Sequence, residues 1–74
     1  MSTPGLSAVA GYVFRSLRDH PDLSLPEAIA TGPAVDGRAD VASVEQALTE
    51  LEGKGLAERG PDRGWRLTEA ALSR

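Results

Sequence analysis

The stretch that decides the fold is residues 40–59, DVASVEQALTELEGKGLAER. Its apolar residues recur at helical spacings, which places them on one face of a helix: Val41, Val44, Leu48 and Leu51. Asp40 suits the N-cap of this helix, because its carboxylate can accept a hydrogen bond from a free amide of the first turn. At the other end Gly55 suits the left-handed C′ position, and Leu56 then packs back on Leu51 in a Schellman ending. The sequence therefore predicts a helix with a buried stripe and a sharply defined end.

A β-hairpin and a short helical turn are predicted after this helix. Two runs with strand character, residues 56–59 and 65–68, flank residues 60–64, which are rich in turn-forming Gly, Pro and Asp. Thr68 suits the N-cap of a terminal helical turn, and Leu72 is expected to anchor that turn to the core. The chain is thus predicted to end in a hairpin followed by one helical turn.

The first helix is predicted over residues 6–19, within a single domain of residues 6–74. Its apolar residues follow one another at spacings of three and four: Leu6, Val9, Ala10, Val13 and Leu17. Pro21 ends this helix, because a proline disfavours helical geometry in the residue before it. Residues 1–5 have little to bury, so we expect them to form a flexible tail.

A short second helix is predicted over about residues 25–30. Ser24 and Glu27 have the S-x-x-E spacing of a capping box, in which both side chains satisfy free amides at a helix start. Residues 31–39 are rich in Gly and Pro and show no periodicity, so they are expected to form a loop. This loop is several residues longer than the tight turn of a helix-turn-helix.

Composition limits the functions that the chain can have. Its 74 residues leave room for one small core, and 8 Lys and Arg against 11 Asp and Glu give a formal charge of -3. With no cysteine and one histidine, neither a metal nor another cofactor is expected, and no enzymatic activity is expected. The longest uncharged apolar run, residues 8–14, is too short to span a membrane. We therefore expect a cytoplasmic protein without membrane contacts.

The order of the predicted elements is that of a winged helix-turn-helix. We expect an α+β, mostly α fold with three helices, a two-stranded β-hairpin wing and a short C-terminal helical turn. Residues 44–69 resemble MarR-like and GntR-like bacterial transcriptional regulators, in which a V-x-x-x-L-x-x-L-x-x-x-G-L run leads into a wing and often an L-T-E ending. This resemblance implies a transcriptional regulator that binds double-stranded DNA with its third helix in the major groove.

The resemblance also places candidate DNA-binding residues. It puts Ser43, Gln46 and Thr49, with Ala42, on the exposed face of the third helix, where their polar side chains suit base edges. It puts Arg63 near the tip of the wing, and arginines of the wing suit phosphates or a minor groove. The full set of candidate DNA-binding residues is Arg38, Ser43, Gln46, Thr49, Arg59, Arg63 and Arg66.

The charge of the third helix favours an alternative function. Residues 40–52 contain four acids and no base, and carboxylates repel the phosphates of DNA. The alternative is a winged-helix module that binds a basic protein through Glu45, Glu50 and Glu52, without binding DNA. Residues 55–74 carry four bases and three acids, so any basic surface is expected in the wing.

The aromatic residues are expected to be mainly packing residues. Trp65 lies beside Leu67 on a predicted strand, and a single tryptophan in that position usually covers the core. Tyr12 and Phe14 lie on or beside the apolar stripe of the first helix. If either is exposed, it is a candidate contact for a second subunit, which leaves a homodimer as a possibility; otherwise it forms the edge of the core.

Overall fold

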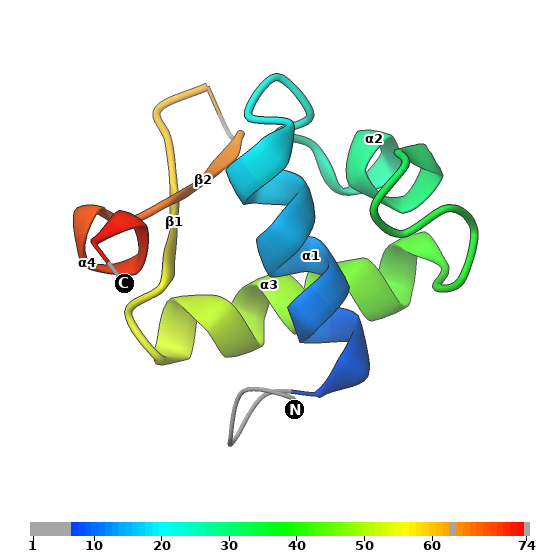
Figure 1. The fold of residues 1–74 in the computed structure, drawn as a ribbon, viewed down its shortest axis with the longest axis horizontal. Helices are drawn as coiled ribbons and strands as arrows, with labels where there is room; N and C mark the ends of the chain where they lie inside the picture. The colour runs from blue at the N-terminus through cyan, green and yellow to red at the C-terminus, as the bar shows by residue number, and fades with distance from the viewer. Residues whose placement is uncertain (1–6, 63, 74) are drawn as a thin grey trace.

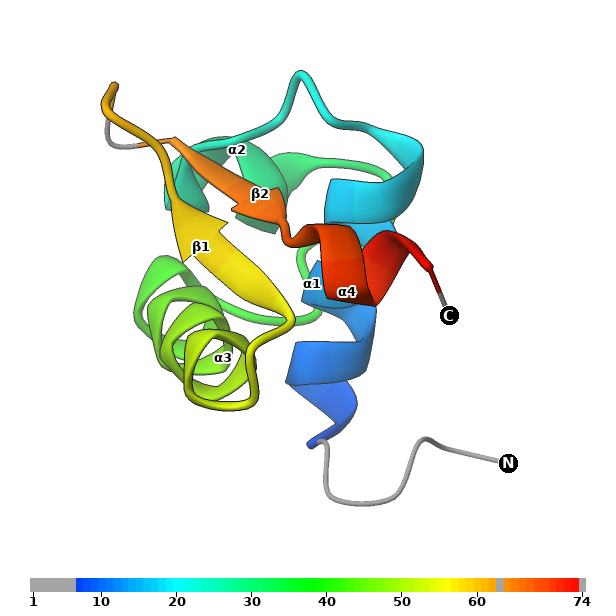
Figure 2. The same ribbon diagram turned by 90° about the vertical axis from the view of Figure 1, so that its left-hand side faces the viewer.

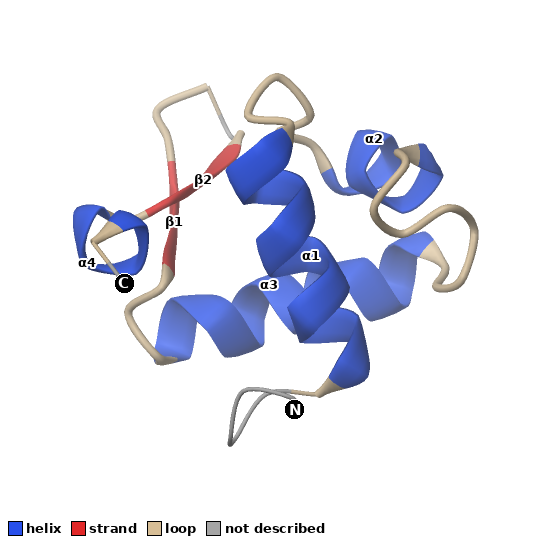
Figure 3. Cartoon of the chain, viewed as in Figure 1, coloured by secondary structure: helices blue, strands red, loops and turns tan. Residues whose placement is uncertain are grey.

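The computed structural model describes residues 7–62 and 64–73, and these form a small α+β fold that is mostly helical, with a two-stranded antiparallel hairpin (Figures 1 and 3). In chain order the elements are α1 (Ala8–Asp19), α2 (Pro26–Thr31), α3 (Val41–Gly53), β1 (Ala57–Arg59), β2 (Trp65–Leu67) and α4 (Glu69–Leu72). The described part has four helices instead of the predicted three, because the expected terminal turn forms a short helix of its own. The predicted tail and Leu6 lie outside the described residues.

Helix α1 begins at Ala8 because Ser7 is its N-cap. The Ser7 hydroxyl accepts a hydrogen bond from the Ala10 backbone N–H at 3.2 Å. The helix ends at Asp19, and the backbone N–H of His20 still donates to the Ser16 carbonyl at 2.7 Å. Three residues of the predicted stripe are buried: Ala10, Val13 and Leu17.

The prediction that a capping box begins α2 is wrong. The N-cap is Leu25, which has no side-chain capping hydrogen bond, and Pro26 occupies the first turn of the helix. Ser24 lies one residue too early to cap, because its carbonyl accepts a hydrogen bond from the Trp65 backbone N–H at 2.7 Å. The residues before α2 are therefore held against strand β2.

The connection between α2 and α3 is fixed to the core in a way that its composition does not indicate. Val35 lies in this connection and is fully buried. Its neighbours turn tightly, with φ angles of +52° at Asp36 and +73° at Gly37. The Asp36 N–H donates to the Gly32 carbonyl at 2.7 Å, which closes the turn around the valine. The length of the connection thus serves to bury one more apolar side chain.

Helix α3 has the two ends that the sequence predicts. The Asp40 carboxylate accepts a hydrogen bond from the Ser43 N–H at 2.8 Å. At the C-terminus the Leu56 N–H donates to the Leu51 carbonyl at 2.9 Å, and Gly55 has a φ of +74°, which confirms the Schellman ending. The predicted stripe is buried except for Val41, which is 39% exposed because it is the first residue of the helix.

The hairpin pairs Ala57 with Leu67, Glu58 with Arg66 and Arg59 with Trp65. Figure 2 shows the two strands side by side, with the turn between them at the end away from α4. Strand β2 is held on its other edge as well, by the hydrogen bond from Trp65 to Ser24. The approach is close: a Cβ atom on Gly64 would lie 2.7 Å from the Ser24 hydroxyl oxygen. A glycine is therefore needed where the hairpin meets the segment before α2.

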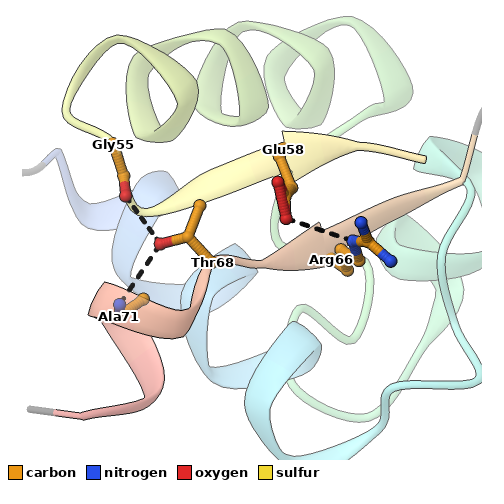
Figure 4. Close-up of polar contacts among 5 residues, drawn as sticks. All are labelled: Gly55, Glu58, Arg66, Thr68 and Ala71. Atoms are coloured by element: carbon orange, nitrogen blue, oxygen red, sulfur yellow. Dashed lines mark hydrogen bonds and ion pairs between the residues drawn. The ribbon is translucent and has the colours of Figure 1, made fainter.

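Thr68 connects the hairpin to α4 (Figure 4). Its hydroxyl donates to the Gly55 carbonyl at 2.6 Å and accepts from the Ala71 N–H at 3.2 Å. The prediction that Thr68 caps a terminal turn is confirmed. The prediction that Leu72 anchors this turn is wrong, because Leu72 is 63% exposed and Ala71 is the residue that is buried.

One hydrophobic core joins these elements. Figure 1 shows helix α1 crossing the middle of helix α3. Ile29, Leu48 and Leu51 are the largest fully buried side chains of the core. Trp65 is buried at the hairpin side of the core, which confirms its predicted packing role. Tyr12 and Phe14 are half-buried against the core, as expected of residues at its edge.

Candidate functional site

A groove of about 410 Å³ lies where the start of α2, the exposed face of α3 and the hairpin meet. The residues that give the groove its chemistry are Leu25, Glu27, Val41, Glu45, Arg59 and Trp65. Pro26 and Thr49 complete its wall. The groove therefore combines apolar side chains, two carboxylates and one guanidinium.

The apolar part of the groove is formed by two side chains that the fold leaves in solvent. Leu25 is 46% exposed and Val41 is 39% exposed. Each lies at a helix start, Leu25 as the N-cap of α2 and Val41 as the first residue of α3, where the core does not reach. Large exposed apolar side chains that share one concave surface are typical of a binding site.

Arg59 and Trp65 form the hairpin side of the groove. They are opposite each other in the strand pairing, and the Arg59 guanidinium carbon lies 4.9 Å from the centre of the Trp65 ring. This is a cation–π contact, in which the positive charge is attracted to the electron-rich face of the indole. Arg59 thus brings a positive charge to this side of the groove while it covers the tryptophan.

Glu27 and Glu45 bring negative charge to the groove from α2 and α3. Both are exposed, and neither takes part in an ion pair with another described residue. Among residues 7–62 and 64–73, the ion pairs join Arg18 to Asp19 and Arg66 to Glu58. The two carboxylates of the groove are therefore available to a ligand.

Helix α3 presents several of the predicted site residues on one exposed face: Ala42, Glu45, Gln46, Thr49 and Glu52. Ser43 is half-buried, and its backbone N–H is used by the N-cap. The Thr49 hydroxyl donates to the Glu45 carbonyl at 3.1 Å, so its oxygen remains free to accept a further hydrogen bond. The polar part of the predicted face is thus assembled around Glu45.

The predicted arginines that the structure describes have different surroundings. Arg66 Nε lies 3.2 Å from Glu58 Oε1 across the hairpin, which offsets its charge (Figure 4). Arg38 lies with its guanidinium carbon 5.5 Å from the centre of the Tyr12 ring, so it is held against α1. Arg63 lies outside the described residues. Arg59 is the predicted arginine that lines the groove.

Glu50 has a different role from the one that the acidic-helix interpretation gives it. Its carboxylate accepts a hydrogen bond from the Ser7 backbone N–H at 3.0 Å, and the residue is half-buried. Glu50 therefore faces the start of α1, whereas Glu45 faces the groove and Glu52 lies on the open surface. Glu27, which the sequence assigns to a capping box, lines the groove in place of Glu50.

The described groups with a shifted pKa lie outside the groove. Hydrogen bonds from the side chain and backbone of Ser43 hold the pKa of Asp40 below its usual value. The hydrogen bond from Arg18 lowers the pKa of Asp19 and raises the pKa of Arg18 itself. Because these shifts arise in a helix cap and a surface ion pair, they indicate structural roles.

Residues 7–62 and 64–73 hold no cluster of three or more metal-ligating side chains and no helix with the length and hydropathy of a membrane span. Comparison of the chain with protein-family models, curated proteins and solved structures finds no match.

Proposed function

We propose that this chain is a winged-helix module that binds a protein partner through α3 and the adjoining groove. The order of the elements supports the winged-helix assignment, with α3 in the position of the recognition helix and the hairpin as the wing. The hydrogen bond from Trp65 to Ser24 adds to this support, because it places the segment before α2 alongside the hairpin.

One observation favours protein over DNA as the partner: exposed Leu25 and Val41 share the groove beside α3 with Glu27 and Glu45. Apolar side chains gain free energy from contact with other apolar groups, and phosphates offer none. Carboxylates beside a phosphate backbone repel it, whereas a basic protein surface is attracted to them. The formal charge of -3 also favours a basic protein partner over DNA.

The proposal is tested with two labelled probes at low salt, a lysine-rich peptide and a double-stranded DNA of arbitrary sequence. We expect the peptide to bind and to shift the backbone amide resonances of α3, and we expect no detectable binding of the duplex. Peptide binding should weaken in high salt, since it depends on exposed charges. If the duplex binds and the peptide does not, the proposal is wrong.

DNA binding is a second candidate function, and the exposed polar face of α3 supports it. Gln46 and Thr49 lie on this face, and Arg59 and Arg66 lie on the adjoining hairpin. Under this alternative, Glu45→Gln should tighten duplex binding because it removes a charge that faces phosphates. Arg63→Ala should weaken binding to all duplexes alike and lower the slope of log affinity against log salt by about 1. An unchanged duplex affinity in Glu45→Gln would count against it.

A further inference from the structure

We propose that the groove selects a short partner segment in which an aliphatic side chain lies next to a lysine or arginine. This inference rests on the proposed function, since it names the chemistry that the protein-binding surface recognises. The aliphatic side chain would contact Leu25 and Val41, and the cation would lie beside Glu27 and Glu45.

The size and lining of the groove support a side-chain anchor. A volume of about 410 Å³ lies near the lower end of the range for ligand sites, which suits a few side chains better than an extended protein surface. Leu25 and Val41 account for two of the three large hydrophobic residues exposed in the described part of the chain. The third, Leu72, lies on α4 and does not line the groove. Burial of an aliphatic side chain against these residues would remove apolar surface from water.

The charges of the groove indicate that the group next to the partner's aliphatic side chain is a cation. Glu27 and Glu45 are exposed and have no ion-pair partner among the described residues. Arg59 lies on the hairpin side and is positive, so a partner cation is repelled from that side and attracted toward α2 and α3. The groove therefore orients its ligand, with the cation on the side of the two glutamates.

The test compares three synthetic peptides of equal length on the full chain. The first is rich in lysine and has one central leucine, the second has serine in place of the leucine, and the third has glutamate in place of the lysines. We expect the serine peptide to bind about tenfold more weakly than the leucine peptide, because it lacks the apolar anchor. We expect the glutamate peptide not to bind. Fluorescence anisotropy measures the affinities, and amide chemical shifts locate the site.

Apolar variants test the anchor and include a matched control. Leu25→Ser and Val41→Ser should each bring the affinity for the leucine peptide close to that for the serine peptide. Leu72→Ser removes an exposed leucine that does not line the groove, and it should leave the affinity unchanged. Loss of the fold does not explain a loss in Leu25→Ser, because a serine at this N-cap supplies the hydroxyl that α2 lacks.

Charge variants test the glutamates. Glu27→Gln and Glu45→Gln should each lower the affinity for both lysine peptides and reduce its dependence on salt. Asp36→Asn is the control, since it removes one negative charge from the α2–α3 connection, outside the groove. Equal effects of all three variants would show that only net charge matters, which contradicts the proposed site.

The outcomes separate the two proposals. If leucine and serine peptides bind α3 equally and both depend on Glu45, the aliphatic anchor is wrong and the protein-binding function stands. If neither lysine peptide binds, the function proposed for α3 is wrong as well. If duplex DNA displaces the leucine peptide from α3 at a lower concentration than the peptide itself requires, the groove belongs to a nucleic-acid surface and the inference is overturned.

Discussion

Glu50 on α3 accepts a hydrogen bond from the backbone N–H of Ser7, at the start of α1, with 3.0 Å between the two atoms. In a capping box the third residue of a helix reaches back to the N-cap N–H, but α1 has Ala10 at that position. Glu50 makes the same contact from another helix, 43 residues away along the chain. The end of α3 therefore completes the cap of α1 and ties the two central helices together.

Glu50→Ala should lower the free energy of unfolding by about 1 kcal/mol, because the Ser7 N–H loses its acceptor and α1 loses a carboxylate at its N-terminus. Glu45→Ala is the matched control on the same helix and should change it by less than about 0.5 kcal/mol. Urea unfolding followed by circular dichroism measures both values. Equal effects of the two substitutions would mean that the contact between Glu50 and Ser7 contributes nothing.

Leu51→Ala should cost about 2 to 5 kcal/mol, because Leu51 is fully buried at the centre of the core. For a domain of this size, that loss is a large part of the total stability. Leu72→Ala is the control, since Leu72 is 63% exposed and should cost less than about 0.5 kcal/mol. Urea midpoints give the comparison, and a midpoint for Leu51→Ala equal to that of the parent would contradict the position of α3 in the core.

Gly53 and Gly55 flank the end of α3, and alanine should have opposite effects at the two positions. Gly55 has a φ of +74°, where a side chain is strained by about 1 to 2 kcal/mol. Gly53 is the last helical residue, and a Cβ atom there meets nothing within 4 Å. Gly53→Ala should therefore raise stability by about 0.5 kcal/mol, and Gly55→Ala should lower it. Thermal unfolding ranks the stabilities of the two variants. A Gly55→Ala variant as stable as Gly53→Ala would refute the left-handed conformation of Gly55 at the end of α3.

The N-cap Asp40 should make stability depend on pH in acid. Because Ser43 lowers the pKa of Asp40 from 3.8, the folded protein favours the carboxylate. The contribution of Asp40 to the stability of the fold is present at pH values above 3.8 and is lost as the pH falls through the lowered pKa. In Asp40→Asn the side chain still caps the helix but does not titrate, so its thermal midpoint should fall less steeply with acid. A decline as steep as that of the parent would show that Asp40 contributes no pH dependence.

The parts of the fold that the sequence predicts well are those with local signals. The N-cap Asp40, the Schellman glycine Gly55 and the cap Thr68 act within one helical turn of their partners, so residue type and spacing are sufficient. The hairpin is predicted from two short runs with strand character and the turn-forming residues between them.

The errors come from contacts that join distant segments. Ser24 fails to cap α2 because its segment is paired with Trp65, and Glu50 turns toward Ser7 because α1 crosses α3. Val35 is buried inside a segment whose Gly and Pro content indicates only a loop. The resemblance places Thr49 on the exposed face of α3, and the acidic-helix alternative names Glu45, but neither shows that α2 brings Glu27 to the same groove. The groove is a product of tertiary packing and has no local signature.

The contact between Arg59 and Trp65 gives this protein an optical reporter of its own. The chain has a single tryptophan, Trp65, which is 5% exposed and lines the groove. A ligand that displaces the guanidinium from the ring should change the quantum yield of the indole without a shift toward the emission of a solvated ring. Unfolding exposes the indole to water and moves its emission to longer wavelengths. The intensity therefore reports occupancy and the wavelength reports folding, both without an attached dye.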